Sequence, residues 1–420
     1  MDMTVRAGRF GGSVPAIASK SCAHRMLICA ALSGAPGRIV CKTVSDDILA
    51  TAACLRALGA RVEQTPDGFA VTPIDRAHIP ADARPDAGES GSTLRFLVPV
   101  AAALGAKCEF FMHGRLPERP LSPLRELLEA NGVTLSAPGS NPLAVSGRLS
   151  GHDFSLPADV SSQFLSGLLF ALPLLGGGTL TMTGRVESGS YLDLTVDALR
   201  RYGVAVARDG MKFTVAGDYR ARARETVEGD WSNAAVWLCA GAIGPAPVTV
   251  TGLRRDSSQG DRAVLDILSR FGARVAWAGD AVTVSPGELS GIELDASDIP
   301  DLVPVLSAVA CKARGRTVIR GASRLRIKES DRLKATADVL GALGADISET
   351  PDGLVIEGGK PLSGGRVDAW NDHRIAMTAA AASLLADGPV TITGAQAVNK
   401  SYPAFFADFA ALGGETEMAP

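Results

Sequence analysis

The sequence predicts an α/β protein of two similar domains, each built from three copies of one repeated unit. The chain has 420 residues, which exceeds the size at which a single hydrophobic core usually stops growing. A pattern of helix and strand recurs six times along nearly the whole chain, and the starts of the helices share one kind of residue. Six copies in a chain of two domains imply three copies in each.

Each repeated unit ends in an amphipathic helix, a glycine, a short strand, a turn and a second strand. The glycine ends the helix because it adopts the left-handed cap conformation without strain. The turns Thr65-Pro66-Asp67-Gly68 and Thr350-Pro351-Asp352-Gly353 are identical and are typical of a reversal between strands. The six glycines lie 69 to 73 residues apart: Gly59, Gly132, Gly203, Gly272, Gly344 and Gly413. Units of this length do not favour a stacked solenoid.

The passage from one domain to the other is predicted after the third copy. That copy closes near Gly217, and residues 219–224, a basic stretch without hydrophobic periodicity, follow it. Residues 1–12 precede the first copy and fit either domain on pattern alone.

Composition and charge exclude some classes of function. The chain is 46% hydrophobic and 21% charged with a net charge of −3, so a nucleic-acid binder with a broad basic surface is not expected. The longest apolar stretch, residues 164–175, contains Pro173 and is too short to cross a bilayer. We expect neither a nucleic acid nor a membrane as partner.

The cysteines and the N-terminus indicate a cytoplasmic protein. The seven cysteines are odd in number and form no C-x-x-C pair, which is typical of small core residues in a reducing compartment. No apolar run follows a basic segment at the N-terminus, so no signal peptide is expected. The five histidines are scattered, and no metal or other cofactor is expected.

Six predicted helix starts carry residues suited to an N-cap. Taken one by one, ordinary capping explains them. Together, six N-termini on one face would attract anions through free N–H groups and helix dipoles. The markers lie 69 to 72 residues apart: Ser19, Gly91, Ser161, Asp230, Asp301 and Asp372.

Basic residues near these starts strengthen the anion-binding interpretation. Four cations lie about one turn or less from a start: Lys20, Arg25, Arg95 and Arg374. Two further basic clusters occupy residues 115–120 and 324–332. Fixed guanidinium and ammonium groups hold phosphates and carboxylates, so the sequence predicts a phosphate-handling cleft between the two domains.

These segments resemble the signatures of the EPSP synthases, a group within the enolpyruvyl transferase family. Nine motifs follow one another in the family's order over nearly the full chain, which makes a chance match negligible. They are residues 19–25, residues 88–95, Arg119-Pro120, Ser161-Ser162-Gln163 with the two residues after it, residues 227–230, residues 299–301, residues 326–333, residues 371–374 and residues 400–403.

The resemblance implies a fold called an inside-out α/β barrel. Two similar domains each contain three βαβαββ-type units around inward-facing helices, with the active site in the inter-domain cleft. The chain of these proteins passes between the domains twice. Residues 13–226 are then expected to form the N-terminal domain, on the shikimate 3-phosphate side, and residues 1–12 with 227–420 the C-terminal domain. We also expect a monomer.

The reaction implied by the resemblance belongs to the shikimate pathway of aromatic amino acid biosynthesis. The enolpyruvyl group of phosphoenolpyruvate passes to the 5-hydroxyl of shikimate 3-phosphate, by addition and then elimination of phosphate. Such chemistry needs general acid–base groups in a closed site, and cations for two phosphates and two carboxylates.

The family's residue roles carry over onto the matching positions of this chain. Asp301 is the expected base for the hydroxyl, Glu329 the expected proton donor and acceptor at the methylene carbon, and Lys20 a third catalytic candidate. Shikimate 3-phosphate is expected to contact Lys20, Ser21, Arg25, Ser161, Ser162, Gln163, Ser188, Tyr191, Asp301 and Lys328. Phosphoenolpyruvate is expected to contact Lys20, Gly91, Arg119, Gln163, Arg332, Arg374 and Lys400.

Purely structural interpretations compete with these roles. Lys328 and Glu329 in a charge-rich segment are also typical of a solvated ion-pair surface. Asp301 after a proline is also typical of a plain N-cap, and His373 of a structural hydrogen-bonding residue. Only the combined pattern favours catalysis.

The chain departs from the commonest family pattern in four places. Ala18 stands where glycine is usual, Glu89 where asparagine is common, Phe96 where many members carry proline, and Arg324 where asparagine is common. None of these changes removes a catalytic group. They leave the response to glyphosate, the inhibitor for which this family is a known target, open.

Other functions are compatible with the same scaffold. The sister enolpyruvyl transferase that acts on a UDP-linked amino sugar usually carries a reactive cysteine in the loop formed here by residues 113–118, where no cysteine occurs. A non-catalytic binder of phosphorylated ligands would lack the acid–base pair, yet Asp301 and Glu329 are both present. RNA phosphate cyclases have related repeats, but no accompanying nucleotide-binding signature is visible.

Overall fold

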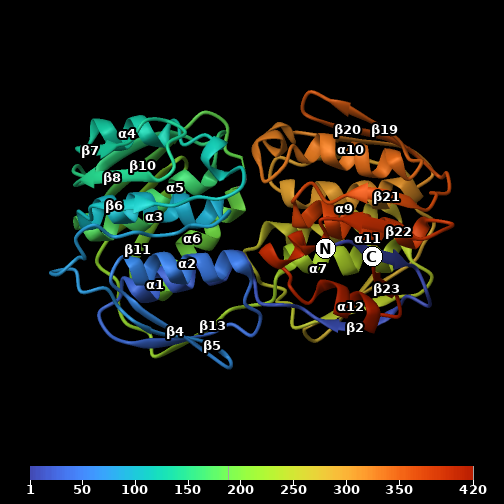
Figure 1. Ribbon diagram of the computed structural model, residues 1–420, viewed down its shortest axis with the longest axis horizontal. Helices are drawn as coiled ribbons and strands as arrows, with labels where there is room; N and C mark the ends of the chain where they lie inside the picture. Colours follow the sequence, from blue (N-terminus) through green and yellow to red (C-terminus); the bar gives the residue numbers. More distant parts are fainter. Residues whose placement is uncertain (188, 420) are drawn as a thin grey trace. The chain divides into compact units, whose positions relative to one another are not determined.

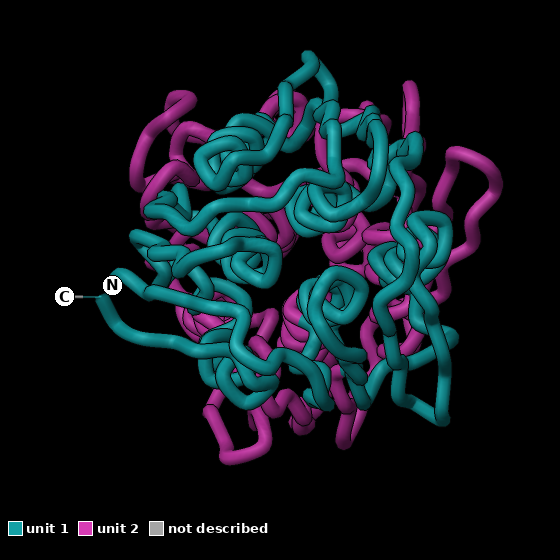
Figure 2. Tube along the Cα trace, turned by 90° about the vertical axis from the view of Figure 1, so that its right-hand side faces the viewer, with its two compact units in different colours: residues 1–19, 228–420 teal, residues 20–227 magenta. Residues whose placement is uncertain are grey.

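The computed structural model describes residues 1–187 and 189–419 and has the predicted α/β class. The chain forms two compact units, shown in Figures 1 and 2. Unit 1 consists of residues 1–19 and 228–420, and unit 2 of residues 20–227. The first boundary predicted from the sequence lies after residue 12. In the structure β2 (Gly12–Pro15) pairs with β14 (Val248–Thr251), and this pairing keeps residues 13–19 in unit 1.

Three sheets in the described part of each unit reproduce the predicted repeat. In five of the six sheets, one edge strand runs parallel to its neighbour. The remaining neighbouring strands of these sheets pair antiparallel. In unit 1 the orders are β2, β14, β16 (Ala281–Ser285), β15 (Arg274–Ala278); β17 (Glu293–Asp295), β18 (Gly315–Arg320), β20 (Gly353–Gly358), β19 (Asp346–Thr350); and β21 (Gly365–Asp368), β22 (Val390–Thr393), β1 (Met3–Arg6), β23 (Glu415–Met418).

The sheets of unit 2 follow the same plan with one reduction. Two of them run β13 (Arg224–Thr226), β3 (Gly37–Val40), β5 (Gly68–Thr72), β4 (Arg61–Thr65) and β9 (Asp153–Pro157), β10 (Gly178–Thr183), β12 (Lys212–Ala216), β11 (Ala205–Asp209). The third has β6 (Cys108–Phe110), β8 (Leu143–Gly147) and β7 (Val133–Leu135). Its parallel partner is reduced to two isolated bridges, Ala83 with Cys108 and Asp86 with Phe111. Pro85, between them, lacks the N–H that a continuous ladder needs.

Six helices in the described chain are buried on nearly every side, and they begin at the predicted starts. They are α1 (Lys20–Ala31), α3 (Gly91–Leu104), α5 (Ser162–Ala171), α7 (Trp231–Ile243), α9 (Val303–Lys312) and α11 (His373–Ala382). In unit 1, α7, α9 and α11 pack against one another, and Figure 2 shows helices of this unit nearly end-on inside the surrounding chain. The small side chains of alanine-rich α11 permit this close packing.

The other six described helices end at the predicted glycines. They are α2 (Asp46–Ala57), α4 (Leu124–Ala130), α6 (Gly189–Arg201), α8 (Val264–Phe271), α10 (Arg332–Ala342) and α12 (Phe405–Ala411). The glycine after each helix has a positive φ, from 81° at Gly203 to 109° at Gly272. The left-handed termination inferred from the sequence is therefore confirmed.

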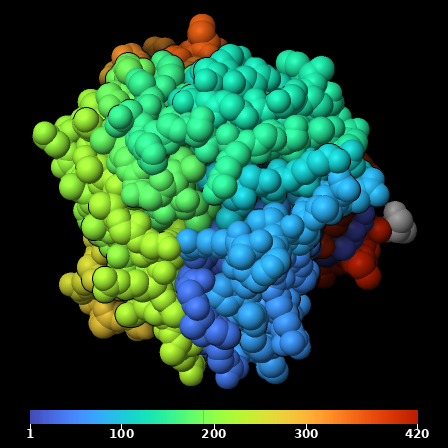
Figure 3. Space-filling view, turned by 90° about the vertical axis from the view of Figure 1, so that its left-hand side faces the viewer, coloured from blue at the N-terminus to red at the C-terminus, as the bar shows by residue number. Residues whose placement is uncertain are grey.

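Short 3-10 turns, which the repeat pattern does not predict, connect several elements. They are η1 (Leu116–Glu118), η2 (Leu172–Leu175), η3 (Gly260–Ala263), η4 (Pro300–Leu302), η5 (Ser323–Ile327), η6 (Ser383–Leu385) and η7 (Ala395–Lys400). On the face of unit 2 in Figure 3, segments from three successive parts of residues 20–227 occupy adjoining sectors, coloured blue, cyan to green, and yellow-green.

The most extensive helix contact in unit 2 lies between α3 and α5. Pro99, inside α3, has no N–H to donate to the Arg95 carbonyl one turn earlier. Gly167 of α5 packs there, and a Cβ at this glycine would be 2.3 Å from that carbonyl oxygen. The missing side chain at Gly167 and the missing N–H at Pro99 together let the two helices meet, which places their N-terminal turns side by side.

Candidate active site

In unit 2, Lys20 is the first residue of α1 and forms an ion pair with an aspartate. Its Nζ lies 2.7 Å from Oδ2 of Asp47, in the first turn of α2. Only 15% and 11% of the two side chains are exposed, so solvent screens this pair less than a surface pair. Asp47 therefore orients the Lys20 ammonium group.

Arg25, about one turn further along α1, bonds to two other predicted shikimate 3-phosphate contacts. Its Nη1 donates to the Ser21 carbonyl and its Nη2 to the Tyr191 carbonyl of α6, both at 2.8 Å. Its Nε donates to Thr195 Oγ1 at 2.9 Å, and the guanidinium lies over the Phe96 ring. Burial lowers the pKa of Arg25 to about 10, so the group stays charged at neutral pH.

Gly91, the first residue of α3, lies directly against the Arg119 guanidinium. A Cβ added at Gly91 would be 2.8 Å from Arg119 Nη1 and 3.0 Å from its Cζ, so a larger residue would displace the arginine. The structure thus brings two predicted phosphoenolpyruvate contacts together. A guanidinium beside the N–H groups of a helix start is a favourable environment for an anion.

The start of α5 joins this group through Gln163. Ser161 caps the helix, and its Oγ accepts from Gln163 N at 3.3 Å. The side-chain Nε2 of Gln163 donates to Ser92 Oγ at 2.9 Å, and its Oε1 accepts from Arg95 Nη1 at 2.8 Å. Arg95 also donates to the Pro120 carbonyl at 3.1 Å. Arg95 thereby connects the starts of α3 and α5 with the segment that follows η1.

Two predicted contacts of unit 2 remain. Ser162 is the first residue of α5 and is buried. Ser188 lies outside the described residues. Two sets of predicted contacts are therefore assembled around helix starts of unit 2. The first is Lys20, Ser21, Arg25 and Tyr191, and the second is Gly91, Arg119, Ser161 and Gln163.

In unit 1, Arg332 connects three carboxylates. Its Nη1 lies 2.8 Å from Asp301 Oδ1, its Nη2 2.8 Å from Glu329 Oε2, and its Nε 2.7 Å from Asp372 Oδ2. Only 2% of the Arg332 side chain is exposed. Burial disfavours the charge, but the three carboxylates outweigh it and raise the pKa of Arg332 above its ordinary value. This arrangement brings the predicted acid–base pair, Asp301 and Glu329, to one guanidinium.

The charges around Asp301 decide its protonation. Burial alone would raise the pKa of this carboxyl, but Lys328, Arg332 and Arg374 hold it well below its usual range. Burial also lowers the pKa of Lys328 to about 8, against the opposing influence of Asp301. At neutral pH the site therefore holds an ionised Asp301 and a Lys328 that loses its proton more readily than an ordinary lysine.

Arg374 and Lys400, two further predicted contacts, flank the same group. Arg374 Nη2 lies 4.0 Å from Asp301 Oδ2, and its Nη1 donates to the Ser232 carbonyl at 2.8 Å. Lys400 Nζ donates to the Asn371 carbonyl at 2.5 Å. Asn371 has a φ of 48°, an uncommon conformation for a residue with a side chain, and such conformations persist where the surrounding structure enforces them.

The structure bears on the purely structural interpretations of three residues. Asp301 is not an N-cap: it lies inside η4, and its carboxylate pairs with Arg332. Glu329 does not belong to a solvated surface, since it pairs with the same buried arginine and only 17% of its side chain is exposed. His373 begins α11 and is buried, and its Nδ1 lies 3.7 Å from Asp372 Oδ1, which is too long for a hydrogen bond.

Several residues of the site were not predicted from the sequence. Asp47 holds Lys20, Thr195 holds Arg25, and Ser232 accepts from Arg374. The sequence marks Asp372 as a helix start within the motif of residues 371–374 and predicts no contact for it, although it binds Arg332 and also caps α11. A signal existed for Asp372, since an acidic residue at a helix start beside a basic residue such as Arg374 is a natural partner for a cation.

The four departures from the family pattern have definite places. Ala18 forms a bridge with Gly229. The Glu89 carboxylate lies against Gly114, where an added Cβ would be 2.6 Å from its Oε2. The buried Phe96 packs under Arg25, and Arg324 donates to the Ser297 carbonyl at 3.2 Å. Of the four, Phe96 touches a predicted substrate contact, Arg25.

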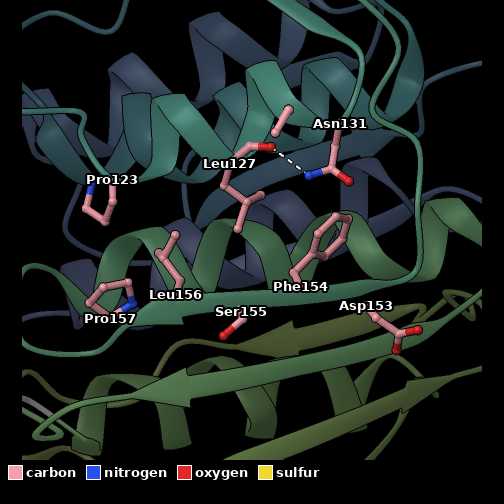
Figure 4. A pocket seen from close by; sticks show the side chains of 9 residues that line it. Pro123, Leu127, Asn131, Asp153, Phe154, Ser155, Leu156 and Pro157 are labelled. Carbon is pink, nitrogen blue, oxygen red and sulfur yellow. Dashed lines mark hydrogen bonds between the residues drawn. The ribbon is translucent and has the colours of Figure 1, made fainter.

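Other surfaces contribute little to the site. A pocket of about 320 Å³ lies between α4 and β9, lined by residues such as Leu127 and Phe154 (Figure 4). None of its lining residues is a predicted contact. Across residues 1–187 and 189–419, no group of three or more His, Cys, Asp or Glu side chains could hold a metal ion. In the same described part, no helix has both the length and the hydrophobicity to span a membrane.

Comparison with known proteins decides the family. The family model described as EPSP synthase (3-phosphoshikimate 1-carboxyvinyltransferase) matches residues 5–409. The chain belongs to the EPSP synthase family. A 3-phosphoshikimate 1-carboxyvinyltransferase of Clostridium kluyveri is 40% identical over 421 residues, covering 99% of this chain and 98% of that protein. The same enzyme of Clostridioides difficile is 39% identical over 431 residues, with coverages of 99% and 98%.

Solved structures of EPSP synthases share the fold. One from Acinetobacter baumannii has a TM-score of 0.81 and 26% identity, covering 99% of this chain and 100% of that one. The enolpyruvyl transferase NikO from Streptomyces tendae has a TM-score of 0.77 at 21% identity, covering 100% and 99%, and supports the fold alone. The predicted family, fold class and enzyme class are confirmed, and the chain is a transferase of the EPSP synthase family.

Proposed function

We propose that this chain transfers the enolpyruvyl group of phosphoenolpyruvate to the 5-hydroxyl of shikimate 3-phosphate. Membership of the EPSP synthase family supports the reaction. The observation that carries the proposed mechanism is the Arg332 cluster, in which Asp301 and Glu329 share one guanidinium beside Lys328. Paired carboxylates next to fixed cations suit proton transfer between anionic substrates.

Asp301 is the proposed base for the hydroxyl. In the free protein three cations keep its pKa low, which makes it a weak base. Anionic substrates that bind Lys328, Arg332 and Arg374 would offset this positive charge and raise the pKa of Asp301. Substrate binding would thus create a better base at the moment when a proton must be removed.

Glu329 is the proposed acid and base at the methylene carbon. It would protonate this carbon during addition and remove a methyl proton when phosphate leaves, while Lys20, held by Asp47, is a third candidate for proton transfer. Shikimate 3-phosphate is proposed to bind Lys20, Ser21, Arg25, Ser161, Ser162, Gln163, Ser188, Tyr191, Asp301 and Lys328. Phosphoenolpyruvate is proposed to bind Lys20, Gly91, Arg119, Gln163, Arg332, Arg374 and Lys400.

Phosphate release tests this function. The purified protein is mixed with phosphoenolpyruvate and with either shikimate 3-phosphate or the UDP-linked amino sugar as acceptor. We expect release that requires shikimate 3-phosphate and falls at least about 100-fold in Glu329→Gln and in Asp301→Asn. Glu357→Gln, an exposed carboxylate of the same unit that pairs with Arg316, should keep full activity. Release only with the UDP sugar, or with neither acceptor, contradicts the proposal.

We infer further that the protein is a cytoplasmic monomer with neither nucleic acid nor membrane as partner. All seven cysteines are free and buried, which suits a reducing compartment, and the net charge of −3 does not favour nucleic acid. Light scattering on the purified protein would measure its mass in solution.

We also propose that glyphosate binds this enzyme, which inhibition measured against phosphoenolpyruvate would test.

A further inference from the structure

A single buried glutamine connects the two places where the chain passes between the units. Gln259 precedes η3 and is only 6% exposed. Its Nε2 donates to Glu228 Oε1 and to the Gly229 carbonyl, both at 2.8 Å. Its Oε1 accepts from Ser19 Oγ at 3.2 Å and from the Trp231 backbone N at 3.0 Å. The side chain thus donates two hydrogen bonds and accepts two, which a primary amide can do.

The partners of Gln259 belong to the two boundary segments of unit 1. One segment ends at residue 19, and the other begins at residue 228. Ser19 N donates to the Glu228 carbonyl, and Asp230 N to the Ile17 carbonyl, both at 2.8 Å. Gly229 is required here, because a Cβ would be 2.5 Å from the Gly252 carbonyl oxygen. The two segments therefore form one short, tightly packed ladder.

Each boundary segment leads directly into a helix that carries a site residue. Ser19 is followed by Lys20, the first residue of α1. Trp231 begins α7 and is followed by Ser232, whose carbonyl accepts from Arg374. The position of Gln259 thus bears on a proposed catalytic lysine through one segment and on a proposed phosphoenolpyruvate contact through the other.

The loop that carries Gln259 is itself held in place. Ser257 Oγ donates to Glu228 Oε1 at 2.8 Å and accepts from Gln259 N at 3.2 Å. Trp231 Nε1 donates to the Arg254 carbonyl at 3.3 Å. A loop fixed at several points can transmit its position to the segments it touches, whereas a mobile loop cannot.

We propose that Gln259 is a positioning residue of this enzyme, which fixes Lys20 through Ser19 and Arg374 through the first turn of α7. The proposal rests on the proposed function for its kinetic consequence, but the local structural consequence is independent of it. A misplacement of about 1 Å in such residues costs on the order of 100-fold in rate. Loss of the amide should therefore lower turnover.

Three variants test the role. Gln259→Met keeps the volume and removes the amide, while Gln259→Glu places a second carboxylate against Glu228. The double variant Glu228→Gln with Gln259→Glu reverses the polarity of their hydrogen bond and can restore it. We expect kcat to fall about 10- to 100-fold in both single variants and to recover at least partly in the double variant. Gln64→Glu, at an exposed position of β4, is the matched control and should behave as the unmodified protein.

Amide hydrogen exchange provides the second readout, which needs no activity. Peptides that cover residues 16–21 and 228–233 should exchange faster in Gln259→Met and Gln259→Glu, and regain protection in the double variant. Unchanged exchange and kcat in the single variants would overturn the proposal, as would a loss of kcat without any local change in exchange. If the unmodified protein shows no transferase activity, the proposed function fails, and exchange alone decides whether Gln259 orders these segments.

Discussion

At the scale of single residues, the contact between Gly91 and Arg119 makes the site sensitive to one methyl group. Gly91→Ala would place a Cβ 2.8 Å from Arg119 Nη1, and the arginine would have to move. Because the side chain is flexible, we expect folding to persist and the KM for phosphoenolpyruvate to rise about 10-fold, a loss of roughly 1.4 kcal/mol of binding. Steady-state kinetics at saturating shikimate 3-phosphate measures the change.

Gly34→Ala is the matched control for this substitution. A Cβ at Gly34 meets nothing within 4 Å, so its kinetics should equal those of the unmodified protein. An unchanged KM in Gly91→Ala would show that Arg119 does not bind phosphoenolpyruvate from its observed position.

Lys328 should give the enzyme an alkaline limit. Burial brings its pKa to about 8, so the free protein loses this positive charge as the pH rises through that value. If Lys328 binds shikimate 3-phosphate, kcat/KM for that substrate should fall above about pH 8. Lys328→Arg should keep its charge at higher pH and extend the profile, because a guanidinium stays protonated. Profiles of the two proteins that bend at the same pH would assign the limit to another group.

The motifs predict which residues gather around Arg332, but not the partners that hold the other site residues. Motif order placed Asp301, Glu329 and Arg332 in one site, and the structure joins them through one guanidinium. Asp47 and Gln259 escaped prediction because their bonds span 27 and 240 residues of sequence. Such bonds depend on side-chain directions that only the folded backbone sets.

At the scale of the elements, the predicted helix starts differ in whether a side chain accepts a hydrogen bond from the free N–H groups of the first turn. Ser90, Ser161, Asp230 and Asp372 each accept a hydrogen bond from an N–H of the first turn, as capping predicts. At the fifth start, Pro300 begins a 3-10 turn. Asp301 lies inside this turn and pairs with Arg332 instead of capping the helix. A periodic pattern could locate that start, but it could not distinguish a capping carboxylate from one that faces an arginine.

The packing of α3 on α5 gives a prediction for an element. Gly167→Ala would place a Cβ 2.3 Å from the Arg95 carbonyl oxygen and 3.0 Å from Pro99 Cγ. The helices must then separate, and we expect a loss of about 1–3 kcal/mol of unfolding free energy, as for other overpacked cores. Activity should also fall, because Arg95 is part of the contact and its partner Gln163 lies one turn before Gly167. Urea denaturation measures the first effect and phosphate release the second.

Gly341→Ala is the control for this element. Gly341 is also helical, in α10, but a Cβ there would be 3.8 Å from its nearest neighbour, Ile347 Cγ2. This substitution should stabilise the protein by roughly 0.5–1 kcal/mol through helix propensity. Equal stability changes in the two variants would contradict the packing argument.

At the scale of the whole molecule, the repeat could be predicted because its signals are local. A glycine with positive φ follows each of the six outer helices of the described chain, and each needs only its own neighbours to be recognised. The sheet that contains β1 could not be derived in this way. β1 lies between β22 and β23, so residues 3–6 complete a sheet with strands near the other end of the chain. Pairing at that distance leaves no periodic signal in the sequence.

Asp261 should make the stability of the whole protein depend on pH. Its carboxyl is buried, and within residues 1–187 and 189–419 its Oδ1 has no hydrogen-bond partner. Burial, and then the charge of Asp301, raise its pKa to about 7, above the value near 4 of an unfolded chain. The protonated form therefore adds stability that is complete below about pH 4 and is lost as the pH rises through 7.

Asp261→Asn keeps the shape and removes this titration, so the comparison isolates one group. Between pH 5 and pH 7.5 the unmodified protein should lose roughly 2–4 kcal/mol of unfolding free energy relative to the variant. Asp301 stays ionised over this window because its pKa is held low, and the buried His24 titrates equally in both proteins. Urea denaturation at the two pH values measures the difference. If the difference in unfolding free energy between the two proteins does not change with pH, Asp261 is already ionised at pH 5. In that case Ser232 and Arg374, which favour its charged form, outweigh the effect of burial.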